Sequence, residues 1–240
     1  EIRIEGLTPG KSVIVTEVSA PPGYIIDNQS QTIQIKEGRT VSLTFKNQPK
    51  GELIIVKRDS ATGAPLPGAQ FRIMTAAGCE VGLDGVIGTS TLTQNGIFET
   101  DSSGQIHITN LAPGAYVVTE IKAPQGYVID QATTNVVIGE GGDTQTVVYD
   151  DRFRIISFTD DAGTETYEYD ELNRRTSETD RNGNTTTYEY DGEYTYPSAI
   201  THPDGTVDRY TYDGNGQITE TVQKDNTTIT NTYDGDGRLL

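Results

Sequence analysis

The sequence predicts an all-β protein, and three observations lead to that fold class. Short runs rich in β-branched and aromatic residues recur along the chain, among them 53–57, 115–120 and the alternating run 185–190. Turn-forming pairs such as Pro113-Gly114 and Asn182-Gly183 separate these runs. No segment shows the period of about 3.6 residues that an amphipathic helix requires. We therefore expect short strands joined by tight turns.

Charge and the rare residue types exclude several classes of function. Asp and Glu number 35 against 18 Lys and Arg, and the net charge of −17 disfavours nucleic acid, since phosphate binding needs a basic surface. One cysteine (Cys79) and two distant histidines (His107 and His202) argue against a disulfide, a metal centre and a catalytic triad. No apolar run approaches the roughly 20 residues of a membrane span. We expect no cofactor, no metal and no enzymatic action on an external substrate.

A first internal repeat has an offset of 103 residues. The run 16–27, TEVSAPPGYIID, matches 119–130, TEIKAPQGYVID, and the match continues to Asn47 and Asp150. The sequence therefore predicts that residues 1–49 are the C-terminal part of a unit that is complete at 50–151.

A second, shorter repeat follows, in a segment that holds nine of the 13 tyrosines. Its signature is a Tyr-Asp pair, and the spacings between successive pairs are 21, 22 and 21 residues. The pairs are Tyr169-Asp170, Tyr190-Asp191, Tyr212-Asp213 and Tyr233-Asp234, and the turn residues before them are Gly163, Gly183, Gly205 and Asn226. We expect a repeat region at 152–240.

Three predicted strands each place one ionisable side chain in phase with two other residues. The sets are Leu53-Ile55-Lys57, Tyr116-Val118-Glu120 and Thr146-Val148-Asp150. Lys57, Glu120 and Asp150 are therefore expected to point towards the core. The alternative is that Lys57 extends to solvent and Glu120 is a buried, hydrogen-bonded acid that does not react.

The runs GELIIVKRDSATGAPLPGAQFRI, TDSSGQIHITNLAPGAYVVTEIKAPQGY and TVVYDD resemble a Cna B-type domain, the SpaA or prealbumin-like module of Gram-positive surface proteins and pilins. The resemblance covers 50–151 and implies a prealbumin-like (Ig-like) β-sandwich. It also implies an autocatalytic isopeptide bond. Lys57 would be the nucleophile, Asp150 the electrophile, with Asp151 as the alternative partner, and Glu120 the proton shuttle.

The partial unit retains two residues of the same set. Glu17 corresponds to Glu120, and Asn47 corresponds to Asp150. Its lysine would lie upstream of residue 1, unless a strand from another molecule completes the sheet. The family pattern has a proline two positions after the partner, as at Pro49, whereas Arg152 stands there after Asp150.

The runs YDELNRRTSETDRNGNTTTYEYD and YDGDGRLL resemble RHS/YD repeats, which implies a spiralling β-sheet shell. The tyrosines would form a cross-strand packing ladder, or alternatively a row that stacks on sugar rings. The runs 213–216 and 234–237 also suggest a calcium loop, but turns explain them and no glutamate follows at loop position 12.

Together the resemblances imply a segment of a large, secreted, wall-attached Gram-positive surface protein. We expect a stalk or adhesin segment, extracellular on the cell surface, whose partners are neighbouring domains of the same chain and host or cell-surface ligands, saccharides included. The alternatives are part of an RHS-type toxin-delivery shell and a carbohydrate-binding module.

Overall fold

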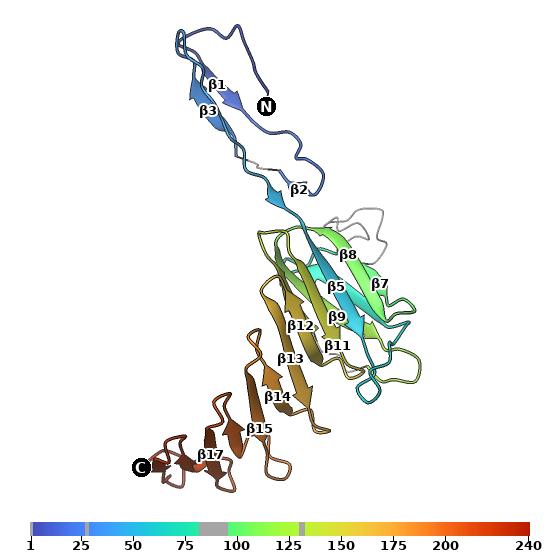
Figure 1. Ribbon diagram of the computed structural model, residues 1–240, viewed down its shortest axis with the longest axis vertical. Coiled ribbons are helices and arrows are strands. Elements are labelled where there is room, and N and C mark those ends of the chain that lie inside the picture. The colour runs from blue at the N-terminus through green and yellow to red at the C-terminus, as the bar shows by residue number, and fades with distance from the viewer. Residues whose placement is uncertain (1, 27–28, 82–95, 130–132) are drawn as a thin grey trace. The chain divides into compact units, whose positions relative to one another are not determined.

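The computed structural model describes residues 2–26, 29–81, 96–129 and 133–240 (Figure 1). These residues form nineteen β-strands and no helix, which confirms the all-β prediction. It follows that the described part of the chain holds no helix suited to crossing a membrane. Backbone contacts divide the chain into two compact units, residues 1–54 with 66–145 and residues 55–65 with 146–240.

The first unit contains several small antiparallel sheets. In its N-terminal part β1 (Ser12–Val15) pairs with β3 (Gln31–Gln34), and β2 (Tyr24–Ile25) pairs with β4 (Gln48–Pro49). A four-stranded sheet follows, in the order β10 (Thr133–Ile138), β9 (Gly114–Lys122), β6 (Gln70–Thr75) and β7 (Ile97–Glu99). β8 (Gln105–Leu111) lies beside β5 (Gly51–Lys57), whose first four residues belong to this unit.

Alternation along these strands builds the core of the first unit. Side chains at every second position of β6 and β9 are buried, and so are those of the first half of β5. Fully or almost fully buried apolar residues are Leu53, Phe71, Ile73, Ile108, Tyr116, Val118 and Ile138. The predicted inward faces of 53–57 and 116–120 are thereby confirmed.

The second unit is a run of antiparallel hairpins that begins at β11, which lies beside β5 in the same sheet. Each strand from β11 onward pairs with the next strand along the chain. The strands are β11 (Thr144–Tyr149), β12 (Ile155–Asp160), β13 (Gly163–Tyr169), β14 (Arg175–Thr179), β15 (Thr185–Glu189), β16 (Ala199–Thr201), β17 (Val207–Tyr212), β18 (Ile218–Val222) and β19 (Thr228–Thr230).

β5 and β11 are neighbours that run parallel. The N–H of Glu52 donates to the carbonyl of Asp143 at 3.1 Å, and the N–H of Arg58 donates to the carbonyl of Tyr149 at 2.8 Å. Both bonds join residues 91 apart along the chain, and a constant offset of this kind defines a parallel pair. The first strand after Lys50 is therefore held directly against the strand that ends before Asp150.

The predicted phase of β11 is wrong. Its buried residues are Gln145, Val147 and Tyr149, whereas Thr146 and Val148 are only partly buried. Asp150 is nevertheless buried, because the chain leaves the strand in a turn whose N–H groups bind its carboxylate. The buried face of this strand includes the polar Gln145, which the apolar pattern did not indicate.

Candidate cross-link site and the Tyr-Asp turns

Lys57 is the last residue of β5, and its side chain is fully buried. Its relative exposure is 0%, the same as for Leu53 and Ile55 on that face of the strand. Its Nζ lies 5.5 Å from the ring centroid of Phe153. The lysine therefore does not extend to solvent.

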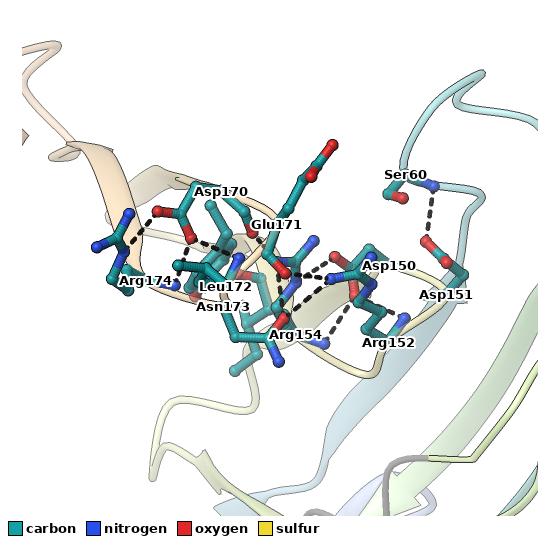
Figure 2. A network of polar contacts seen from close by, with 12 residues as sticks. Ser60, Asp150, Asp151, Arg152, Arg154, Asp170, Glu171, Leu172, Asn173 and Arg174 are labelled. Carbon is teal, nitrogen blue, oxygen red and sulfur yellow. Dashed lines mark hydrogen bonds and ion pairs between the residues drawn. The ribbon is translucent and has the colours of Figure 1, made fainter. Parts of the chain in front are cut away.

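Asp150 is the buried member of the two neighbouring aspartates. Its side chain has 0% exposure, and its carboxylate is bound by the turn that follows it. Oδ1 accepts the backbone N–H of Arg152 at 3.0 Å and that of Arg154 at 2.8 Å, while Oδ2 accepts Nε of Arg154 at 2.7 Å. Asp151 is partly exposed and accepts the backbone N–H of Ser60 at 2.9 Å (Figure 2). Burial thus distinguishes Asp150 from Asp151.

Glu120 lies on β9 in the first unit, opposite Phe71 of β6, and its side chain is 1% exposed. It continues the buried face of Tyr116 and Val118, as the alternation predicted. A carboxyl group so buried is favoured in its neutral form unless charges or donors compensate.

The partial unit brings its two predicted site residues together. The side-chain amide of Asn47 donates from Nδ2 to Oε1 of Glu17 at 2.9 Å, in a partly buried setting. Thirty residues separate the two in sequence, and the 103-residue repeat was the signal that singled them out.

The Tyr-Asp pairs form one recurring turn. At Asp170, Oδ1 accepts the N–H groups of Leu172 and Arg174, and Oδ2 accepts Nε of Arg174 at 2.7 Å. The fourth residue of the turn, Asn173, has φ of 63°. This is a type I turn followed by a left-handed residue, a common hairpin connection.

The same backbone pattern recurs at three further Tyr-Asp pairs, and also at Asp101 and Asp180 in other turns. Asp213 accepts the N–H groups of Asn215 and Gln217, and Asp234 accepts those of Asp236 and Arg238. Asp150 has the same contacts, and Phe153 is the left-handed residue there (φ 61°). Tyr149-Asp150 is therefore a fifth Tyr-Asp pair, which the sequence reading missed. The signal was present, because the pair lies 20 residues before Tyr169-Asp170.

Asp191 departs from this pattern. The segment after it replaces the turn with Gly192-Glu193-Tyr194, where the N–H of Tyr194 donates to the carbonyl of Asp191 at 3.3 Å.

Two arginines, Arg154 and Arg174, each link a turn to the segment that follows it. Nη1 of Arg154 donates to the carbonyl of Asp170 at 2.9 Å and to Oδ1 of Asn173 at 3.1 Å (Figure 2). Its guanidinium carbon lies 4.9 Å from the ring centroid of Tyr169, and that of Arg174 lies 4.4 Å from the ring of Tyr190. The first two repeats are thus joined by the same cation–π arrangement.

The hydroxyl groups of the signature tyrosines bind backbone carbonyls 14 or 15 residues earlier. Tyr169 donates to Ile155 at 3.0 Å, Tyr190 to Arg175 at 2.7 Å, Tyr212 to Pro197 at 2.9 Å and Tyr233 to Ile218 at 2.9 Å. These contacts favour the packing ladder over a row of rings that await sugar.

Burial also raises the pKa of two other tyrosines of the sheet. Burial, followed by hydrogen bonding to Glu165, raises the pKa of Tyr167 to about 12. Burial, followed by hydrogen bonding to Glu178, raises the pKa of Tyr188 to about 12. Both phenols therefore stay protonated at neutral pH and act as donors.

The remaining candidate residues lie in turns or at the surface. The oxygens of Asp213 and Asp234 bind backbone N–H groups, as turns require, and no group of three or more metal-binding side chains occurs among the described residues. Cys79 is an exposed thiol, and His107 faces outward and binds Glu52 at 2.8 Å.

The family comparison identifies the larger part of the chain. The model of the SpaA prealbumin-like fold domain matches residues 1–49 and 51–153. The chain belongs to this family, whose model matches it in two successive segments. The model of the teneurin YD-shell matches 138–223, so both models include β11 and the turn at Asp150. A search of curated proteins finds no match.

Several solved structures are similar to parts of the chain. The group B streptococcus pilus 2b backbone protein is 24% identical over 60% of this chain and 52% of its own, with a TM-score of 0.35. The Bacillus anthracis TIE protein is 26% identical over 74% and 35%, with a TM-score of 0.38. GBS52, the minor pilin of Streptococcus agalactiae, is 25% identical over 61% and 62%, with a TM-score of 0.37. The chain spans less than two thirds of each of these proteins.

Proposed function

We propose that this chain is a structural shaft segment of a secreted, wall-attached surface protein, stabilised by an isopeptide bond between Lys57 and Asp150. The observation that carries the proposal is the burial of both side chains, each with 0% exposure, at the ends of two neighbouring parallel strands. Membership of the SpaA family supports a structural role at the cell surface. The repeat region would be displayed by this shaft.

The chemistry needs no external reagent. Burial disfavours the ammonium form of a lysine, so the neutral amine of Lys57 becomes available to attack Cγ of Asp150. A C–N bond forms, one C–O bond of the carboxyl group breaks, and the oxygen leaves as water. Glu120 would take a proton from the attacking nitrogen and return it to the leaving oxygen.

The bond would change how the shaft carries load. It would join the first strand of the domain to its last strand, so tension along the chain would bypass the residues between them. By analogy with a disulfide that closes a loop of similar length, it would add about 3–5 kcal/mol to the free energy of unfolding. The bond would cross-link the domain covalently without a disulfide, in a chain that has a single cysteine.

Intact mass tests the bond. The wild-type chain is expected to weigh one water less than its sequence, and Lys57→Ala or Glu120→Ala should restore the full mass. Lys50→Ala serves as a matched control, since this lysine precedes the same strand and should leave the deficit in place. Asp150→Ala and Asp151→Ala decide the partner. A wild-type mass equal to the mass of its sequence would contradict the mechanism.

In the partial unit we propose the equivalent roles for Glu17 and Asn47. The hydrogen bond between their side chains supports this assignment. A lysine from outside residues 1–49 would attack Asn47, and ammonia would leave instead of water. Peptide mapping of the parent protein for an amide at Asn47 tests the assignment, and an unmodified Asn47 would contradict it.

A second candidate, part of an RHS-type delivery shell, is favoured by the YD-shell match over 138–223. It predicts that the parent protein encloses a polypeptide that resists protease until the shell is opened. Rapid digestion of every segment outside the repeats would count against it.

A further inference from the structure

The two partner residues of the family site sit in different surroundings. The side chain of Asn47 donates to Glu17, the residue that corresponds to the proton shuttle. Both carboxylate oxygens of Asp150 instead bind donors of the following turn, from Arg152 and Arg154.

The residue two positions later explains part of this difference. In the turn at Asp150, the N–H of Arg152 binds Oδ1. The position after Asn47 that corresponds to Arg152 is Pro49, and proline has no N–H to donate. The aspartate turn cannot form in the same way there, and the Asn47 side chain is left for Glu17.

Three hydrogen bonds hold the carboxylate of Asp150, from the N–H groups of Arg152 and Arg154 and from Nε of Arg154. We call them the clamp on Asp150, and they oppose amide formation. Nε of Arg154 donates a charge-assisted hydrogen bond to Oδ2, and this bond must break before that oxygen can leave. The oxygen that must leave as water needs a proton, and arginine cannot supply one because it stays protonated in proteins. The two backbone N–H groups hold the other oxygen.

We propose that Arg154 is a positioning residue that holds Asp150 in an unreactive state, so that the first Tyr-Asp turn slows the Lys57–Asp150 bond. This inference rests on the proposed cross-link. Arg154 is in turn anchored to the carbonyl of Asp170 and to Asn173 of the next repeat. Folding of the first repeat and cross-linking therefore compete for the same carboxyl group. The bond would form before the turn closes, or after the turn is opened.

The test is the rate of water loss in the 240-residue chain, followed by intact mass from the first minutes after refolding from denaturant, with peptide mapping of the Lys57–Asp150 link. In Arg154→Gln the initial rate should rise about tenfold or more, the order expected when one charge-assisted hydrogen bond to the leaving oxygen is lost. Glutamine suits this position, because Gln217 donates its N–H to Asp213 in an equivalent turn.

Two matched variants separate positioning from general loss of structure. Arg174→Gln makes the same change in the next turn, where the aspartate is not a cross-link partner, and should leave the rate unchanged. Arg154→Lys keeps a cation beside Asp150 and should stay close to the wild-type rate. If Arg154→Gln only disordered the site, water loss would become slower. If the substitution removes the clamp on Asp150, water loss becomes faster.

The outcomes decide the inference and the proposed function separately. If the wild type cross-links and Arg154→Gln is no faster, the inference is overturned and the cross-link stands. If only Arg154→Gln cross-links, the inference holds and the bond is not a feature of the native chain. If neither loses water, both are overturned. Lys57→Ala, which cannot form the link, is the blank for every comparison.

Discussion

The ring of Tyr196 stacks on the ring of Tyr212, with the centroids 5.6 Å apart and 26° between the planes. In the first two repeats the ring of the signature tyrosine is covered by an arginine, Arg154 over Tyr169 and Arg174 over Tyr190. Tyr196 belongs to the irregular segment after Asp191 that has no such arginine. An aromatic ring thus takes the place of a guanidinium, and Tyr212 remains covered.

Tyr196→Ala is expected to destabilise the repeat sheet by about 1 kcal/mol, since an aromatic pair contributes roughly 0.5–1.5 kcal/mol beyond its buried area. Urea unfolding measures the change. Tyr194→Ala is the matched control, because Tyr194 is similarly exposed (51% against 52%) and its ring has no aromatic partner among the described residues. Equal losses in the two variants would show that the stacking contributes nothing.

The repeat sheet should lose stability in acid. The side chain of Asn184, then the N–H groups of Asn184 and Asn182, lower the pKa of Asp180 in the folded state. At Asp170 burial would raise the pKa, but hydrogen bonds and the charge of Arg174 outweigh it and lower the pKa. Because the unfolded state then binds protons more readily, this stabilisation is present above about pH 4 and disappears as the pH falls through the lowered folded values.

Urea midpoints measured from pH 7 down to pH 3 test this expectation. Asp180→Asn keeps an acceptor oxygen but removes the titrating group, so its midpoint should depend less on pH. Asp161→Asn, at an exposed turn position between β12 and β13, should keep the wild-type dependence. Parallel curves for wild type and Asp180→Asn would refute the assignment.

Gly51 allows close packing at the start of β5. A Cβ at this position would lie 2.5 Å from a methyl group of Ile138 and 2.6 Å from the carbonyl oxygen of Asp143. Gly51→Ala should therefore lower the free energy of unfolding by about 1–3 kcal/mol, the usual cost of overpacking. At Gly214 a Cβ would meet nothing within 4 Å, so Gly214→Ala should be close to neutral. Thermal melting of the two variants makes the comparison, and a wild-type melting temperature for Gly51→Ala would contradict the packing.

Phe153 occupies a left-handed conformation that is unusual for a bulky residue. It is 3% exposed, and its ring stacks on Tyr149 with centroids 4.5 Å apart. Phe153→Gly would relieve a backbone cost of about 1–2 kcal/mol but lose aromatic burial of about 3–5 kcal/mol. We expect a net loss of roughly 1–4 kcal/mol. Asn173→Gly, the same change in the next turn, should be neutral or stabilising, and equal responses would show that the Phe153 ring is dispensable.

Local patterns predicted much of the fold and part of the candidate site. Alternation in β5 and β9 placed Lys57 and Glu120 on buried faces, because each lies two residues after a buried apolar residue of the same strand. The same rule failed in β11, whose buried side chains are Gln145, Val147 and Tyr149. A polar glutamine on the buried face hides that face from a pattern of apolar residues.

Contacts between repeats were beyond the sequence reading. The contact between Asp150 and Arg154 was not predicted, because residues 146–151 resemble the end of a prealbumin-like domain. Tyr149-Asp150 also lies 20 residues before Tyr169-Asp170, which fits the spacing of the second repeat. The substitution of Tyr196 for an arginine depends on which side chains meet across neighbouring hairpins, and spacing alone does not encode that.

The turn from Asp150 to Arg154 also limits how this chain can be recombined. Domains that are joined by linkers can be exchanged as modules, because few contacts cross the joint. Here the predicted boundary between 151 and 152 falls inside a hydrogen-bonded turn, and β11 pairs directly with β12. A crossover in the gene at that point would separate Asp150 from both of its arginine donors. Shuffling of such repeat regions would succeed only where the exchanged piece carries the last strand of the preceding domain with it.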